Sequence, residues 1–366
     1  MMQAAAWPRA EPLDERLLVV DTEHELIRDA QVRDLPGLLA PGDALILNDA
    51  ATLPASLHTR DRELEVRLAG HARSAWGTGA APQSFVAVLF GRGDYSVPTE
   101  ARALPRAVQR GEVLSFGAEL CARVISVDAH EPRLVELRFE QSGAALYRGL
   151  YRYGRPIQYA YVGDPLPLFH VQSRFAGAPW AFEPPSAGRP LTIGALRELM
   201  HRGVHLGHVT HAAGISSTGS SSLDARFPLA ERYEIHTSAI AAISAARREG
   251  GRVIAAGTTV ARALEASAAE HCAVIEGQGV ASLRLGPRHA LQAVDGILTG
   301  MHAPGTSHFE LLEAFAPREL LERVDAHAQA QAYLGHELGD SCLLLPRVLA
   351  LSVSGCRRCR SARLAS

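Results

Sequence analysis

The 366-residue chain has few cysteines, little net charge and no long apolar run, and each shortage argues against a class of protein. The most apolar stretch, 342–353, is interrupted by Pro346 and Arg347 and falls short of the roughly 18 uninterrupted residues of a membrane span. The start, MMQAAAWPRA, lacks the basic and apolar parts of a secretory signal. With 47% hydrophobic and 21% charged residues, the composition predicts a globular cytoplasmic protein of about two domains, with no membrane partner.

The five cysteines are too sparse for a disulfide framework. Cys356 and Cys359 form a C-x-x-C motif near the C-terminus, without a second such motif beside them. A metal or redox role for this pair is the alternative to two free thiols. Sixteen histidines are present, but no H-E-x-x-H motif occurs among them, so we predict no metal site.

The net charge of −2 does not indicate a polyanionic partner, and binding to nucleic acid would need a local basic patch. The segment 347–366 is the strongest candidate for one, because it contains Arg347, Arg357, Arg358, Arg360 and Arg363. We expect this segment to be a flexible basic tail instead.

The pattern of apolar residues predicts an α+β fold with two domains. Short β-type runs at regular spacing between 55 and 145 predict a small antiparallel β-barrel. The flanking segments alternate strands with helices, including a helix at 191–202 with Thr192 as its N-cap and a helix at 237–249 that ends at Gly250. We therefore expect a mixed α/β main domain built from residues 1–54 and 146–346, with the barrel inserted at 55–145.

The segment GRVIAAGTTVARALEAS is a candidate ligand-binding turn. A buried strand at 252–256 runs into Gly257, Thr258 and Thr259 and then into a helix. Such a turn directs backbone N–H groups and a helix N-terminus at whatever lies above it, which suits a carboxylate or another anion. Arg262 and Glu265 lie on one face of this helix. A capped helix with a surface salt bridge is the alternative.

Three further segments carry polar residues next to strands. In VDGILTGMHAPGTS, Thr299 and His302 follow a strand and precede a helix capped by Thr306 or Ser307, where His302 could act as an acid or a base. The loop around Gly214 is built of small residues that let a ligand approach the backbone. The stretch AERYEI places Glu231, Tyr233 and Glu234 together as a possible carboxylate pair. A structural histidine, a flexible loop and solvated acids are the alternatives.

These segments occur in the order and at roughly the separations of the queuosine-pathway S-adenosylmethionine:tRNA ribosyltransferase-isomerase family, which the chain resembles to about Pro346. PGDALILNDAATLPASL resembles the family's PGDLLVxNxTRVxPARL, and EPPSAGRPLT resembles APTAGLHFT. AERYEI resembles SEYYEI, and RVIAAGTTVARALE resembles RVIAVGTTSVRxLE. VDGILTGMHAPGTS resembles VDxLxTNFHLPxST, and YLGHELGD resembles YRFFSYGD.

The resemblance implies transfer of the ribosyl part of S-adenosylmethionine to the aminomethyl group of a 7-deazaguanine in tRNA. Adenine and methionine are lost, and the ribosyl part rearranges to an epoxycyclopentane. A base would remove the proton beside the sulfonium, and a clamp would hold the methionine carboxylate. We assign the clamp to Thr258 and Thr259 with Arg262. The predicted catalytic residues are Glu231, His302 and Tyr233, and the predicted substrate-binding residues are Asn48, Ser186, Ala187, Gly188, Gly214, Gly257, Thr258, Thr259, Arg262, Glu265, Thr299 and Asp340.

The chain departs from the family at several cationic, histidine and aromatic positions. These positions hold Ala51, Ser56, Pro190, Ala212, Gly300, Met301 and Leu334, and His211 lies one place before the family's histidine. A one-residue offset on a strand turns a side chain to the opposite face. Because such residue types hold nucleic acid, three interpretations stay open: a divergent tRNA-modifying enzyme, a related enzyme with a small-molecule acceptor, and a non-catalytic S-adenosylmethionine-binding module.

Overall fold

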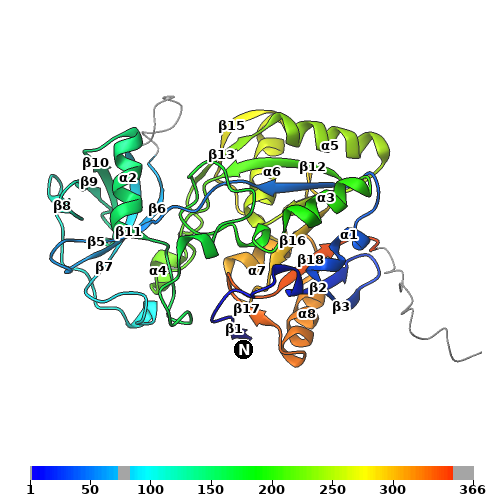
Figure 1. The fold of residues 1–366 in the computed structure, drawn as a ribbon, viewed down its shortest axis with the longest axis horizontal. Helices are drawn as coiled ribbons and strands as arrows, with labels where there is room; N and C mark the ends of the chain where they lie inside the picture. Colours follow the sequence, from blue (N-terminus) through cyan, green and yellow to red (C-terminus); the bar gives the residue numbers. More distant parts are fainter. Residues whose placement is uncertain (1, 73–82, 349–366) are drawn as a thin grey trace, which may run out of the picture.

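The computed structural model describes residues 2–72 and 83–348, and its main feature is a large mixed sheet (Figure 1). The sheet has nine strands. In spatial order they are β15 (Gly277–Ala281), β13 (Glu231–Ile235), β12 (His205–His211), β4 (Ala44–Asn48), β14 (Val253–Ala256), β16 (Gly296–Gly300), β18 (Ser341–Leu345), β2 (Arg16–Asp21) and β3 (Leu26–Gln31).

Helices cover both faces of this sheet because its strands are apolar on both sides. One face packs against α5 (Thr237–Glu249), α6 (Thr258–His271), α7 (Ser307–Leu312) and α8 (Arg318–Ala330). The other packs against α1 (Leu35–Leu38) and α3 (Ile193–His201). Side chains alternate between the two cores along each strand, so that Leu18 and Val20 face α8 while Leu17 and Val19 face α1. The main body is therefore a three-layer α/β arrangement.

A second, antiparallel sheet of seven strands has its own hydrophobic core. In spatial order its strands are β11 (Gly154–Arg155), β5 (Ser56–His58), β6 (Glu65–His71), β7 (Ser84–Phe90), β10 (Leu134–Phe139), β9 (Cys121–Val127) and β8 (Val113–Ser115). Helix α2 (Gly143–Tyr153) supplies Leu146 and Leu150 to this core. The antiparallel strands were predicted, but β8 and β11 lie at opposite edges and do not pair with each other within the described residues, so the strand pairing does not close a barrel.

The remaining elements are short. A two-residue pair joins β1 (Gln3–Ala4) to β17 (Leu334–Gly335), and α4 (Ser221–Asp224) precedes β13. Single 3-10 turns occur at η1 (Pro12–Asp14), η2 (Val32–Asp34), η4 (Thr99–Ala101), η5 (Leu168–His170) and η6 (Ser186–Gly188). The cysteine pair at 356 and 359 and nearly all of the basic segment lie outside the described residues.

Several local predictions are confirmed. Helix α5 spans Thr237–Glu249 and ends at Gly250, whose φ of 71° places it in the left-handed region that glycine adopts without strain. Thr192 caps α3 by accepting a hydrogen bond from the Ala195 N–H at 3.1 Å. Thr306 caps α7 in the same way.

Among residues 2–72 and 83–348, no helix combines the length and the apolar character that crossing a membrane would require.

Candidate active site at the carboxyl edge of the large sheet

The four central strands β12, β4, β14 and β16 run parallel, so their carboxyl ends meet at one edge of the sheet. Asn48, at the end of β4, ties three of the segments there together. Its amide nitrogen donates to Thr259 Oγ1 at 3.1 Å and to the His211 carbonyl at 3.2 Å, while its oxygen accepts from the His211 N–H at 3.0 Å. In α/β sheets with parallel central strands, this edge is where ligands bind.

The N-terminus of α6 opens onto this edge. Gly257, which precedes the helix, has a φ of +107°, a conformation that side-chain-bearing residues rarely adopt. No side chain caps the helix, so the first-turn N–H groups of Thr258 and Thr259 are directed outward. Turn η6 lies directly above, because a Cβ added to Gly257 would come within 3.5 Å of Ala187. The predicted residues 186–188 and 257–259 are therefore neighbours, at a terminus that favours anions.

Behind this helix terminus lies a buried ion pair between Arg262 and Glu231. Arg262 also donates to the Ala281 carbonyl at 2.9 Å, and Glu231 accepts from the Gly214 N–H at 2.6 Å. Burial raises the pKa of the Glu231 carboxyl, and the Arg262 charge and the Gly214 N–H partly offset this effect. Arg262 is therefore engaged by protein groups and only 5% exposed.

His211 completes this buried group. Its Nε2 lies 3.6 Å from Glu231 Oε2, and neither ring nitrogen has a hydrogen-bond partner among the described residues. Burial and the nearby Arg262 charge lower the pKa of His211 well below its usual value, so the ring is neutral at pH 7. The sequence placed His211 one position from the family's histidine, and its contacts show that it faces α6.

His302 lies on the loop after β16. Its Nε2 shares a hydrogen bond with Thr299 Oγ1 at 2.8 Å, and its ring stacks on His308 with centroids 4.8 Å apart. Burial and the charges of His308 and His336 lower the pKa of His302 well below its usual value. A neutral imidazole held by a hydroxyl is suited to accept a proton or to orient a polar ligand. His308 had no signal in the sequence beyond lying in the first turn of a helix.

Four predicted residues point elsewhere. The Tyr233 ring lies in the core beneath α6, and Glu234 bonds to Gln278 on the opposite face of the strand, so Glu231 and Glu234 do not form a carboxylate pair. Glu265 is buried and accepts the N–H groups of residues 292–294. Asp340 accepts from Arg9 and from the Arg16 N–H. The carboxylates of Glu265 and Asp340 thus hold the chain together.

The segment 153–190 adds buried polar groups near this edge. Tyr159 donates to Glu183, and Tyr161 donates to Glu337. These residues line a cavity of about 20 Å³. Burial raises the pKa of Glu337 to about 6. No sequence pattern pointed to these pairs, because their partners come from distant parts of the chain.

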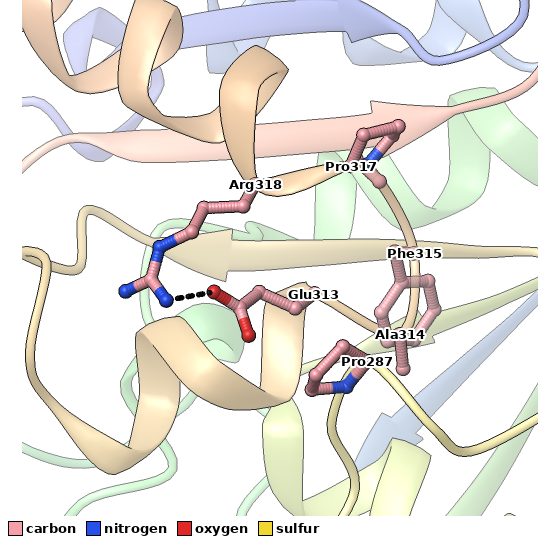
Figure 2. A pocket seen from close by; sticks show the side chains of 7 residues that line it. Pro287, Glu313, Ala314, Phe315, Pro317 and Arg318 are labelled. Atoms are coloured by element: carbon pink, nitrogen blue, oxygen red, sulfur yellow. Dashed lines mark ion pairs between the residues drawn. The ribbon is translucent and has the colours of Figure 1, made fainter.

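Figure 2 shows a larger surface hollow. It has a volume of about 520 Å³ and is lined by residues 313–318 and Pro287. Figure 2 shows the ion pair between Arg318 and Glu313 at the rim of the hollow, with Arg318 Nη1 3.3 Å from Glu313 Oε1. None of the predicted site residues lines it.

Comparison with known proteins agrees with the sequence resemblance. The family model described as queuosine biosynthesis protein matches residues 2–344. An S-adenosylmethionine:tRNA ribosyltransferase-isomerase of Methylorubrum extorquens is 30% identical, with 96% of both chains covered. One from Methylocella silvestris is 33% identical, with 92% of this chain and 93% of the relative covered. The crystal structure of S-adenosylmethionine tRNA ribosyltransferase from Thermotoga maritima is 20% identical, with a TM-score of 0.49 over 93% of this chain and 96% of that one.

A three-layer α/β body with polar groups gathered at the carboxyl edge of its parallel strands defines a ligand-binding α/β protein. Within that class, the chain belongs to the queuosine biosynthesis protein family, whose model covers nearly its whole length.

Proposed function

We propose that this protein is an S-adenosylmethionine:tRNA ribosyltransferase-isomerase. It would transfer the ribosyl part of S-adenosylmethionine to the aminomethyl group of a 7-deazaguanine in tRNA, with release of adenine and methionine. The observation that carries the proposal is similarity along nearly the whole chain to relatives with that name, at 30–33% identity. The polar side chains gathered at the carboxyl edge of the large sheet supply a site of suitable chemistry.

In this proposal, the N-terminus of α6 receives the methionine carboxylate. The uncapped first turn at Thr258 and Thr259 supports this role, since it offers backbone donors and a favourable dipole. Arg262 contributes indirectly. Its guanidinium is paired with Glu231, so it holds α6 in place behind the turn and does not form the clamp itself.

His302 is the proposed base that removes the proton beside the sulfonium. It is neutral at pH 7 because its pKa is lowered, and Thr299 holds its ring. Loss of that proton lets the ribose ring open and expel adenine. Glu231 is the second candidate. It is held by Arg262 and Gly214, which suits a role in positioning His211 and the turn. Tyr233 lies too deep in the core for a catalytic role.

The acceptor is proposed to be tRNA, and the positions where this chain departs from the family are compatible with this. Ala51 and Ser56 are only 9% and 7% exposed. Ser56 donates to the buried carboxylate of Glu65, which is itself paired with Arg67 and Arg102. Pro190, Ala212 and Met301 are buried as well. These five replacements therefore lie at buried positions, whereas Gly300 and Leu334 are partly exposed.

A small-molecule acceptor is the second candidate, because Gly300 and Met301 replace the family's Asn-Phe pair between Thr299 and His302. One experiment distinguishes the two acceptors. The protein is incubated with S-adenosylmethionine, with and without tRNA that carries the deazaguanine, and the release of adenine and methionine is followed by mass spectrometry. Release only with modified tRNA is expected. Release at the same rate without tRNA would favour the small-molecule acceptor. Binding without release, including after addition of cell-extract metabolites, would identify a non-catalytic module.

We also propose that the seven-stranded sheet forms a separate inserted domain. Its core is distinct from the two cores of the large sheet. Because α2 and β11 pack and pair within it, the contacts favour a boundary near 155, later than the expected 145.

A further inference from the structure

Three side chains with metal-binding atoms converge beside the end of β4. Asp49 follows β4, His208 lies within β12, and His236 follows β13. Among the described residues, one ligand atom from each lies within 4.8 Å of the other two. Asp49 lies 159 positions before His208, and His236 lies 28 positions after it, so no local motif links the three residues.

This cluster lies on the opposite face of the sheet from the candidate active site. Leu206 packs into the core beneath α3, and His208, two residues later on the same strand, shares its face. His211 faces α6 and contacts Glu231. The cluster is therefore distinct from the site at the α6 terminus, although Asp49 directly follows Asn48.

The spacing of the first two ligands suits a tetrahedral metal site. His208 Nε2 lies 3.5 Å from Asp49 Oδ2. Two ligands of a tetrahedral Zn²⁺ ion at about 2.1 Å are separated by roughly 3.4 Å. The His236 ring lies against that of His208, with centroids 4.5 Å apart. The His236 ligand atom lies within 4.8 Å of the other two, so the His236 ring has to move inward to complete a three-ligand set.

Neighbouring hydroxyl groups bond to all three ligands. Ser238 Oγ bonds to His208 Nδ1 at 2.8 Å, which leaves Nε2 free to face Asp49. Thr210 Oγ1 donates to Asp49 Oδ1 at 2.5 Å and leaves Oδ2 free. Because the Thr210 hydroxyl gives its one proton to Asp49, His236 Nε2 donates to Thr210 Oγ1 at 2.8 Å, and Nδ1 is the His236 nitrogen left for a metal. Partners of this kind fix ring orientation and tautomer at metal sites.

The cluster is open to solvent and carries suitable charge. The His208 side chain is 41% exposed and that of Asp49 is 20% exposed. Two imidazole rings and one carboxylate are donor groups that bind divalent transition-metal ions, and the carboxylate supplies the negative charge.

We propose that Asp49, His208 and His236 bind one divalent transition-metal ion, with Zn²⁺ as the best fit. Water completes the coordination on the exposed side. Bound metal would fasten the ends of β4 and β12, from which Asn48 and the His211 backbone reach the candidate active site, to the start of α5. This inference goes beyond the proposed function and does not depend on it.

The test uses the full chain with Cys356→Ser and Cys359→Ser, so that the terminal thiols do not bind metal. After chelator treatment, the protein is titrated with Zn²⁺ by calorimetry and with Co²⁺ by visible absorption. We expect one equivalent of metal and a tetrahedral Co²⁺ spectrum. Asp49→Asn, His208→Gln and His236→Gln should each weaken binding at least tenfold, as expected for loss of a ligand.

His205→Gln is the matched control, because His205 lies on the same strand but pairs with Glu249 at the other end. Its affinity should equal that of the parent. Circular dichroism checks that each variant is folded, and the parent's Co²⁺ spectrum tests the site without any ligand substitution. Absence of stoichiometric binding by the folded parent would overturn the proposal, as would equal affinity in all ligand variants. Either result would leave an ordinary hydrogen-bonded cluster.

Discussion

At the scale of single residues, Arg262 shows how far the structure changes an expectation from sequence. The segment RVIAAGTTVARALE predicted that Arg262 shares a helix face with Glu265 and helps Thr258 and Thr259 to clamp a carboxylate, with a surface salt bridge as the alternative. In the structure, Arg262 pairs with Glu231, which lies 31 residues earlier in the chain. A helical spacing of three cannot reveal a partner on a distant strand. The same limit applies to Glu231 and Glu234, which are close in sequence but lie on opposite faces.

The buried pair makes Arg262 important for stability. Arg262→Ala should lower the free energy of unfolding by about 3–5 kcal/mol, because it leaves the Glu231 carboxylate buried without its partner. Denaturation with urea measures the change. The double variant Arg262→Met with Glu231→Leu should recover much of the loss, since both charges are then removed. A loss of less than about 1 kcal/mol in the single variant would contradict a buried, uncompensated charge.

His302→Gln tests the proposed base. Adenine release should fall by about 10²–10⁴-fold, which is the usual contribution of a positioned proton acceptor, while S-adenosylmethionine binding stays within a few-fold. Because the pKa of His302 is lowered well below 6.5, the rate of adenine release by the parent protein should not fall as the pH passes through 6.5. His205→Gln serves as the control. Full activity of the His302→Gln variant would show that another group acts as the base.

At the scale of elements, periodicity and capping residues predicted helices well. Helix α5 was predicted over its full range because an alanine-rich helix is followed by glycine in a left-handed conformation. The antiparallel strands of the small sheet were also predicted. The predicted closure into a barrel was not found, since the edge strands β8 and β11 do not pair within the described residues. Whether a sheet closes depends on strand tilt and register, which local alternation does not encode.

Thr192 offers a test at this scale. Thr192→Ala removes the hydroxyl that accepts from the Ala195 N–H at 3.1 Å. The free energy of unfolding should fall by about 1 kcal/mol, whereas Thr192→Ser should preserve it. Thermal or chemical denaturation measures both. Equal stability of the two variants would show that the cap contributes nothing.

At the scale of the whole molecule, the order of strands in the large sheet determines which residues meet. Strand β4 lies between β12 and β14, and this placement brings Asn48, His211 and Thr259 together. The resemblance to a family pointed to Asn48 and Thr259 separately, but only the sheet order joins them. The Asp49, His208 and His236 cluster, which the absence of a local motif argued against, has the same origin.

Acid should destabilise the molecule. Burial lowers the pKa of His71 to about 3 and that of His308 to about 4. The unfolded chain therefore binds more protons below pH 6.5, and stability decreases as the pH falls through that value. Between pH 7 and pH 5, each of these two histidines should lower the free energy of unfolding by about 2 kcal/mol. Glu337, whose pKa is raised to about 6, partly offsets this loss. Urea denaturation at both pH values measures this, and His71→Leu should reduce the difference. A free energy of unfolding that rises toward pH 5 would contradict the lowered pKa values of His71 and His308.

The most direct test of the central claim is a crystal structure of the protein with S-adenosylmethionine. Our account predicts that the methionine carboxylate lies within hydrogen-bond distance of the Thr258 and Thr259 N–H groups, with the ribose beside His302. Density for the ligand elsewhere, such as in the hollow lined by Phe315 and Arg318, would contradict the assignment of the active site to the carboxyl edge of the large sheet.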